Sequence, residues 1–211
     1  MHSIASVTTA NEERSNRRRE LIVWGVVLVL LNVPLLACRN SSALAFLPGK
    51  VAAGEWWRLF THPFVHVSWY HFLLDGTAFL FLWQNLEGQL SKRLGTLVAS
   101  AVGSLLFAAV GSHAFWSLGL CGLSGIAHGV MAQQGLDLHV HGGSRQERRL
   151  GGLLFVAVLA KSLRETFTGA ALFGHWHLGS VGMPIVACHL GGVCGALFFH
   201  VIKGASVNSR S

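Results

Sequence analysis

Apolar residues along this chain occur in six long runs, separated by polar or glycine-rich segments. The runs cover residues 21–37, 69–86, 94–114, 120–138, 150–167 and 184–202. An α-helix needs about 20 apolar residues to cross the hydrocarbon core of a bilayer, so each run has roughly the length of a membrane span. The pattern predicts an all-α fold, a polytopic membrane helix bundle with six transmembrane helices.

The same pattern divides the chain into one membrane domain and two polar ends. Residues 1–20 are predicted to form a basic cytoplasmic tail that is disordered or loosely held, residues 21–203 the six-helix membrane domain, and residues 204–211 a cytoplasmic C-terminal tail. Residues 39–68 form a long loop rich in aromatic residues, which suits a position at the membrane interface.

Two runs carry features that complicate this interpretation. The first follows a basic segment and precedes Cys38 and the Ala-Leu-Ala sequence at 43–45, so a cleaved signal peptide is an alternative to a first span. The fifth contains Lys161, Arg164 and Glu165. Because charges are costly at the bilayer centre, we expect these three near its outer end, where long side chains reach the interface.

The distribution of basic residues predicts the orientation. With a cytoplasmic N-terminus, the inner segments receive eleven basic residues and the outer segments three. The inner ones are Arg14, Arg17, Arg18, Arg19, Lys92, Arg93, Arg145, Arg148, Arg149, Lys203 and Arg210, and the outer ones are Arg39, Lys50 and Arg58. Cytoplasmic segments of membrane proteins carry the excess of Lys and Arg, so both termini are expected in the cytoplasm.

Composition agrees with a membrane protein and argues against a nucleic-acid-binding one. Hydrophobic residues make up 52% of the chain and charged residues 12%. The net charge is +7, but the basic residues lie between the apolar runs and form no stripe interleaved with aromatic residues. No nucleic-acid partner is therefore expected.

Candidate chemistry lies within the apolar runs. Ser124 stands between Gly122 and Gly125 at the outward start of the fourth run, where unpaired amides and the positive end of a helix dipole can stabilise an oxyanion. The two glycines are expected to give a substrate backbone room to approach. His189 lies at a similar depth in the sixth run, which predicts a Ser-His nucleophile and base.

A further polar group lies where the second run begins. His62, His66 and His71 are followed by Asp75, one helical turn after His71 and on the same face. Polar groups at membrane depth are functional candidates by default.

Together these motifs resemble the rhomboid intramembrane serine proteases. They are Glu55-x-Trp57-Arg58, His66-x-x-x-x-His71-x-x-x-Asp75, Gly122-x-Ser124-Gly125 and His189-x-x-Gly192, in this order across residues 20–203. The resemblance implies that Ser124 is the nucleophile and His189 the general base, with no third catalytic acid. It also implies that His71 and the Ser124 amide hold the oxyanion.

The resemblance assigns supporting roles to four more residues. His66 would bond the first loop and Arg58 would brace it, while Gly192 and Ala196 would let the sixth helix approach the fourth. Asp75 departs from the family, because rhomboids usually place an oxyanion-donating Asn at this position. Either a protonated Asp75 donates, as carboxylic acids do in some oxyanion holes, or its side chain points elsewhere.

Within the family, the chain most resembles the rhombosortase branch. The features are the Gly-Glu-Trp-Trp-Arg-Leu-Phe-Thr-His stretch from Gly54, the Trp69-Tyr70-His71 context and His128-Gly129 after the serine motif. This branch implies a bacterial inner-membrane protein in contact with lipid. Its partners would be single-span substrates with a C-terminal Gly-Gly motif, a hydrophobic helix and a basic tail, besides any accessory membrane protein.

Two other classes of function stay open. A metal or haem membrane protein would use the pairs His62 and His66, His139 and His141, or His175 and His177, but these pairs fall on different sides of the membrane. No cofactor and no metal are therefore expected. An inactive rhomboid-like protein that binds membrane helices is the second, and Asp75 is the argument for it.

The four cysteines show no spacing typical of a metal site. Cys188 and Cys194 are expected to be small packing residues. Cys38 and Cys121 are both predicted near the outer face, where a disulfide is chemically allowed, although we expect free thiols.

Overall fold

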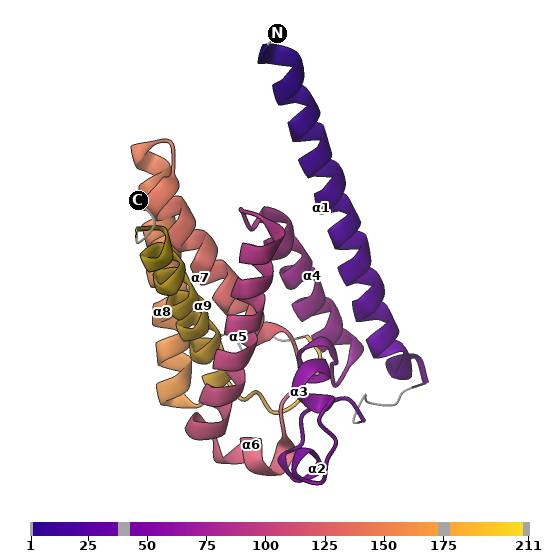
Figure 1. Cartoon of the computed structure of the whole chain (residues 1–211). Helices are drawn as coiled ribbons and strands as arrows, with labels where there is room; N and C mark the ends of the chain where they lie inside the picture. Colours follow the sequence, from indigo (N-terminus) through magenta and orange to yellow (C-terminus); the bar gives the residue numbers. More distant parts are fainter. Residues whose placement is uncertain (1, 38–42, 173–177, 209–211) are drawn as a thin grey trace.

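The computed structural model describes residues 2–37, 43–172 and 178–208, and within these ranges the chain forms helices, turns and one isolated β-bridge (Figure 1). The long helices are α1 (His2–Asn32), α4 (Trp69–Asn85), α5 (Leu90–Gly111), α7 (Ser124–His141), α8 (Arg145–Thr168) and α9 (Ala187–Asn208). The short elements are η1 (Val33–Ala37), α2 (Pro48–Ala52), α3 (Arg58–Thr61), η2 (His62–Phe64) and α6 (His113–Leu118). The all-α prediction is confirmed, and each apolar run lies largely within one long helix.

Helix α1 begins much earlier than its apolar run. No glycine or proline occurs between residues 2 and 24, and the Ala, Glu and Arg residues there favour helix. Arg17 donates to the carbonyl oxygen of Leu86, and Glu20 accepts from Trp83 Nε1 at 3.0 Å, so this part of α1 is held against the end of α4. Residues 2–20 are therefore helical, in contrast to the expectation of a disordered segment.

Helix α7 begins later than its apolar run, at Ser124 instead of residue 120. Leu120 pairs with Phe46 of the first loop in the β-bridge, with both N···O distances at 2.9 Å. Gly122 has a φ of 99°, which an α-helix cannot include. The bridge and the glycine together make Ser124 the first residue of the helix.

Helix α8 begins earlier than its run because a capping box fixes its start. The Ser144 hydroxyl accepts from the Glu147 amide, and the Glu147 side chain accepts from the Ser144 amide. The helix ends at Thr168 and is followed by Gly169, a left-handed C-cap whose amide donates to the Glu165 carbonyl.

Helix α9 packs closely against α5 and α7 through small residues. A Cβ atom at Gly192 would overlap the carbonyl oxygen of Gly125 on α7, and one at Gly191 would overlap that of Gly103 on α5. Ala196, one turn further along, is fully buried. These contacts bring the start of α9 against the start of α7.

Polar residues lie inside the bundle and large apolar residues lie outside it. Ser100, Ser104 and Gln133 are buried, whereas Val102 and Val110 of α5 are exposed. Exposed apolar side chains follow one another along α1, α4, α8 and α9 as well. An apolar exterior of this extent suits contact with lipid.

By length and composition, two of the described helices are apolar enough to cross a membrane. They are Arg14–Ala37 and Leu90–Gly111, and Ala187–Lys203 is apolar but shorter. The other long helices carry polar side chains that face the interior, such as Gln133 and Asp137 on α7, and these lower their mean hydropathy.

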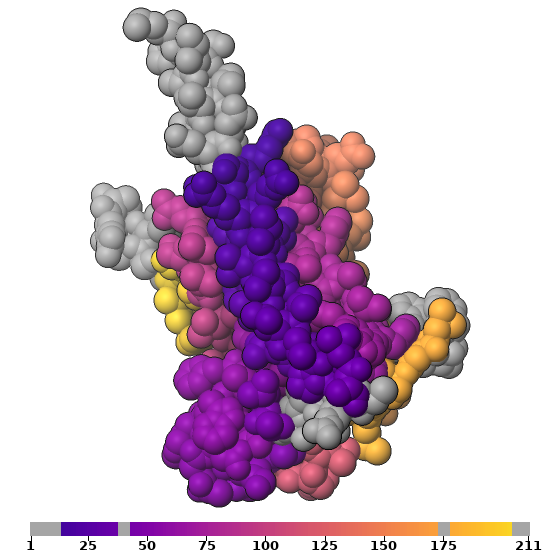
Figure 2. Space-filling view, turned by 90° about the vertical axis from the view of Figure 1, so that its right-hand side faces the viewer, coloured from indigo at the N-terminus to yellow at the C-terminus, as the bar shows by residue number. Residues whose placement is uncertain are grey.

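Helix α1 begins and helix α9 ends at the same end of the bundle. Figure 1 shows the beginning of α1 and the end of α9 at the top, with α2, α3 and α6 at the opposite end. Figure 2 shows the described part of α1 lying along one face of the molecule, above the first loop. At the end where α1 begins, Lys92 bonds both carboxylate oxygens of Asp137 at 2.9 Å.

Candidate active site

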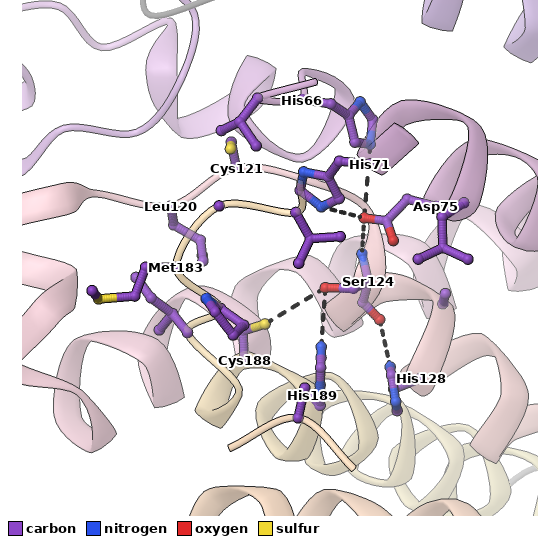
Figure 3. Close-up of a pocket in the computed structure, with 18 of the residues that line it drawn as sticks. His66, His71, Asp75, Leu120, Cys121, Ser124, His128, Met183, Cys188 and His189 are labelled. Atoms are coloured by element: carbon purple, nitrogen blue, oxygen red, sulfur yellow. Dashed lines mark hydrogen bonds and ion pairs between the residues drawn. The ribbon is translucent and has the colours of Figure 1, made fainter. Parts of the chain in front are cut away.

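Ser124 and His189 face each other where α7 and α9 begin. Ser124 Oγ lies 3.1 Å from His189 Nε2, a hydrogen-bond distance (Figure 3). The close packing at Gly125 and Gly192 brings these two helix starts together. His189 is buried and Ser124 is partly exposed, so the hydroxyl remains open to a second molecule.

The other ring nitrogen of His189 contacts Glu165. Glu165 Oε2 lies 2.7 Å from His189 Nδ1, and this side chain of α8 is buried. Sequence alone predicts Glu165 near the outer end of its span and indicates no role for it. A signal was available, since a carboxylate within a membrane span is expected to have a partner, but the partner is 24 residues away in sequence.

His128 completes the surroundings of the His189 ring. The two imidazoles stack with centroids 4.1 Å apart and an angle of 11°. His128 Nδ1 lies 2.7 Å from the carbonyl oxygen of Ser124, and its Nε2 lies 2.8 Å from Lys161 Nζ. In the sequence, His128 stands out only as part of the His128-Gly129 motif.

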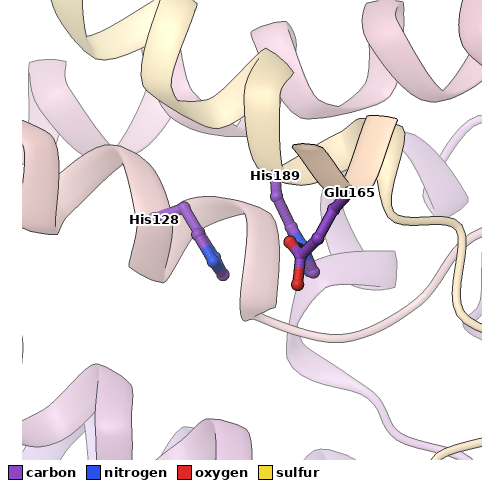
Figure 4. Close-up of side chains that lie close together, drawn as sticks. All are labelled: His128, Glu165 and His189. Atoms are coloured by element: carbon purple, nitrogen blue, oxygen red, sulfur yellow. Dashed lines mark hydrogen bonds and ion pairs between the residues drawn. The ribbon is translucent and has the colours of Figure 1, made fainter. Parts of the chain in front are cut away.

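These side chains include a group that could hold a metal ion. One ligand atom each from His128, Glu165 and His189 lies within 4.8 Å of the others, and the three residues come from three helices (Figure 4). Lys161 Nζ lies 2.8 Å from both carboxylate oxygens of Glu165 as well as from His128. A cationic side chain therefore already engages two of the three residues.

Asp75 and His71 lie on the opposite side of Ser124 (Figure 3). Asp75 Oδ2 accepts a hydrogen bond from the Ser124 amide at 3.1 Å and lies 3.1 Å from His71 Nε2. The two groups expected to hold an oxyanion, the Ser124 amide and His71, thus share one carboxylate oxygen. The side chain of Asp75 points at the expected oxyanion position and not away from it.

Gly122 and Gly125 make room for the protein's own atoms. A Cβ at Gly122 would lie 2.9 Å from Asp75 Oδ2 and from His71 Nε2, and one at Gly125 would lie 2.9 Å from the Cys188 carbonyl oxygen. This differs from the expectation that both glycines make room for a substrate backbone.

His66 and Arg58 hold the first loop in place. The His66 amide donates to Asn32 Oδ1 at 2.9 Å, which fixes the loop to the end of α1. Buried Arg58 bonds Glu55 at 2.8 Å through Nε and the Ala45 carbonyl at 2.6 Å through Nη1. Burial lowers the pKa of His66 to about 4, although the Asp75 carboxylate opposes this shift. His66 is therefore neutral at pH 7.

The histidine pairs considered as metal ligands do not form such sites among the described residues. His62 Nδ1 is 3.0 Å from the Arg58 carbonyl oxygen, and burial lowers its pKa to about 4. His139 Nδ1 is 2.9 Å from the Arg148 carbonyl oxygen, at the far end of α7. His175 and His177 lie outside the described residues.

Three cysteines are free thiols: Cys121, Cys188 and Cys194. Cys188 Sγ lies 3.9 Å from Ser124 Oγ and so forms part of the wall around the serine. Cys38 lies outside the described residues.

A cavity of about 840 Å³ opens onto these groups. Ser124, His189 and His71 line it, together with Leu172 and Met183 of the segments that follow α8 and precede α9. Apolar side chains make up most of its wall, so it suits a hydrophobic peptide segment.

A Ser-His pair in hydrogen-bond contact at two helix starts, inside a helical bundle with an apolar exterior, is typical of a membrane protein that carries a serine nucleophile. The sequence profile of the Rhomboid domain matches residues 53–206, which is more than half of the chain. The chain therefore belongs to the rhomboid family, a family of intramembrane proteases with some inactive members. None of the curated proteins matches the chain.

Proposed function

We propose that this protein is an intramembrane serine endopeptidase in which Ser124 is the nucleophile and His189 the general base. The observation that carries the proposal is the 3.1 Å contact between Ser124 Oγ and His189 Nε2 beside an apolar cavity. His189 takes the hydroxyl proton as Ser124 attacks a peptide carbonyl, and then gives it to the leaving amine. Water hydrolyses the acyl-enzyme by the same steps.

The oxyanion forms where Asp75 Oδ2 now lies. The Ser124 amide and His71 Nε2 both contact this oxygen at 3.1 Å, and a substrate carbonyl that displaces it meets the same two groups. Once displaced, the Asp75 carboxyl no longer accepts from these two donors, and in its protonated form it donates to the oxyanion. Asp75 then replaces the amide donor usual in the family.

The six long helices α1, α4, α5, α7, α8 and α9 are the proposed membrane spans. The apolar outer surfaces of α1, α4, α5, α8 and α9, the central position of α7 and the basic residues near the end where α1 begins support this assignment. In this arrangement both termini lie in the cytoplasm of a bacterium, and Ser124 lies toward the outer face of the inner membrane. Peptide bonds near that face are the ones it can reach.

The proposed substrates are single-span membrane proteins cut just outside their membrane helix. A stable helix shields its carbonyl groups, so cleavage needs a segment that unwinds, and glycine favours unwinding by about 1 kcal/mol relative to alanine. The likeness to rhombosortases around Gly54, Tyr70 and His128 supports substrates that carry a C-terminal Gly-Gly signal. Lipid and an accessory membrane protein complete the proposed partners.

A second candidate is an inactive rhomboid-like protein that binds membrane helices. The Asp75 carboxylate occupies the expected oxyanion position, and an ionised carboxylate there would repel the developing charge. Retention of both Ser124 and His189 favours the protease.

A serine-reactive fluorophosphonate separates the two candidates. Purified protein in lipid is incubated with the probe, and the modified peptide is identified by mass spectrometry. If the protein is a protease, the probe modifies Ser124. The variants Ser124→Ala and His189→Ala then show no labelling, although they are expressed at the same level. An inactive protein stays unlabelled under conditions in which a control serine protease reacts completely.

A further inference from the structure

The Glu165 carboxylate makes four polar contacts deep in the bundle. Oε2 lies 2.7 Å from His189 Nδ1 and 2.8 Å from Lys161 Nζ. Oε1 accepts from the same Nζ and from the Leu172 amide, both at 2.8 Å. A buried charge that lacked such partners would be costly, so these contacts keep Glu165 ionised beside the histidine.

The contact between Glu165 Oε2 and His189 Nδ1 fixes which nitrogen of His189 carries the proton. An ionised carboxylate only accepts hydrogen bonds, so His189 Nδ1 must be the donor. In the neutral ring Nε2 then has a free lone pair, and Nε2 is the atom 3.1 Å from Ser124 Oγ. The tautomer that a general base requires is therefore set by Glu165.

We propose that Glu165 is a positioning residue that acts through His189, so that the protein works with a Ser124–His189–Glu165 triad. The carboxylate holds the ring in one orientation, selects the Nε2-basic tautomer and stabilises the imidazolium that forms when Ser124 gives up its proton. This inference rests on the proposed function and departs from the expectation of a dyad without an acid.

Lys161 and His128 support the same arrangement. Lys161 can only donate, so His128 Nε2 accepts from it, and His128 Nδ1 carries the proton that is donated to the Ser124 carbonyl. His128 is therefore neutral and stacks against His189 without a competing charge. Lys161 neutralises Glu165 and is held one helical turn from it on α8.

A metal ion at His128, Glu165 and His189 is the competing interpretation of the same cluster. Such an ion would have to displace Lys161 from the two Glu165 oxygens and from His128 Nε2. The hydrogen bond from His189 Nδ1 also occupies the Glu165 oxygen nearest to that ring. Treatment with a chelator is therefore part of the test.

The charged and titratable groups near His189 come from α8, α7, α4 and α9 itself. Glu165 and Lys161 face it from α8, Ser124 and His128 from α7, and the Asp75 carboxylate lies beyond Ser124 on α4. On α9 itself, Cys188 is the neighbouring titratable side chain. Of these groups, Glu165 is the carboxylate in direct contact with the imidazole, so its removal destabilises the imidazolium most.

The experiment compares wild type, Glu165→Gln and Glu165→Asp, with Ser162→Ala as the matched control. Ser162 is a buried side chain on the same helix, three residues away from Glu165 and outside the site. For each protein in lipid, the rate of fluorophosphonate labelling at Ser124 is measured from pH 5 to 9, together with kcat, KM and the melting temperature.

The triad predicts that Glu165→Gln lowers kcat and the labelling rate by up to about 10⁴-fold at pH 7, as replacement of a triad carboxylate by an amide does. KM changes little, Glu165→Asp keeps more activity than Glu165→Gln, and Ser162→Ala behaves as wild type. The acidic limb of the labelling rate also moves to lower pH in Glu165→Gln, because the imidazolium has lost its anion. Chelator leaves the wild-type rate unchanged.

Three outcomes overturn the triad. The first is equal rates and equal pH profiles in wild type and Glu165→Gln when both label at Ser124. The second is activity lost to chelator and restored by zinc, which assigns the cluster to a metal. The third uses wild type alone and so does not depend on variant folding: ¹⁵N spectra of histidine-labelled protein that show the proton of neutral His189 on Nε2. Absence of wild-type labelling would instead reject the proposed function.

Discussion

The backbone amide of Ser124 donates a hydrogen bond to the carboxylate of Asp75, with 3.1 Å between the nitrogen and Oδ2. This contact joins the first residue of α7 to the middle of α4, and His71 Nε2 reaches the same oxygen at 3.1 Å. The acid thus lies at the centre of the proposed oxyanion hole, and its protonation state decides whether it assists or opposes the reaction.

Substitution of Asp75 tests the part it plays. If its carboxyl donates to the oxyanion, Asp75→Asn retains turnover and sustains it to higher pH, because an amide does not ionise. Asp75→Ala loses about 2 to 4 kcal/mol of transition-state stabilisation, the usual cost of removing an oxyanion donor. The measurement is kcat/KM against pH for the three proteins, and equal values in all three would show that Asp75 takes no part.

His62, one of two buried histidines of the first loop, predicts acid sensitivity of the fold. Burial lowers the pKa of His62 to about 4 from its ordinary 6.5, so the unfolded chain binds the proton first as pH falls. The contribution of neutral His62 to the free energy of unfolding is fully present above pH 6.5 and is lost as the pH falls toward 4. From pH 7 to 5 the loss amounts to about 2 kcal/mol from this residue.

The measurement is the free energy of unfolding in detergent at pH 7 and pH 5. His62→Asn keeps a donor for the Arg58 carbonyl and removes the titration, so the difference between the two pH values shrinks, although the variant is less stable at pH 7. An unchanged difference would mean that other groups cause the acid sensitivity.

The contact between α7 and α9 predicts opposite effects for two glycine substitutions. Gly192→Ala places a Cβ on the carbonyl oxygen of Gly125 and should cost about 1 to 3 kcal/mol of stability. Gly25→Ala, in α1, meets open space and should be neutral or stabilise by about 0.5 to 1 kcal/mol. Equal effects in thermal unfolding would contradict the close approach of the helices.

Accessibility of introduced cysteines tests the orientation. In a variant whose native cysteines are replaced, Lys50→Cys in the first loop should react with a membrane-impermeant maleimide added outside intact cells. Gly143→Cys, between α7 and α8, should react only after the cells are opened. The reverse pattern would place Ser124 toward the cytoplasm and reject the proposed cleavage site.

Much of the fold could be predicted from the apolar runs, because each long helix contains an apolar run about as long as a membrane span. The helix starts could not be predicted as well. An apolar run begins at residue 120, yet the bridge to Phe46 and the positive φ of Gly122 delay α7 until Ser124. The bridge is made with the first loop, and hydropathy alone does not predict where that loop lies.

The candidate site also contains residues that local sequence patterns indicate and one that they do not. The Ser124 and His189 motifs and the His71–Asp75 face are local patterns, and sequence indicated them. Glu165 was missed because its partner lies on another helix, and its charge suggested an interfacial side chain. The carboxylate is buried because Lys161, one turn earlier, accompanies it inside.

The central claim is tested most directly by proteolysis in a defined membrane. Purified wild type and Ser124→Ala are reconstituted separately into liposomes with a single-span substrate that carries Gly-Gly before its membrane helix. A matched Leu-Leu substrate tests the sorting signal separately. The account predicts that wild type releases the soluble domain at one bond near the membrane surface and that Ser124→Ala releases none. Cleavage at the same bond by cleanly purified Ser124→Ala would contradict it.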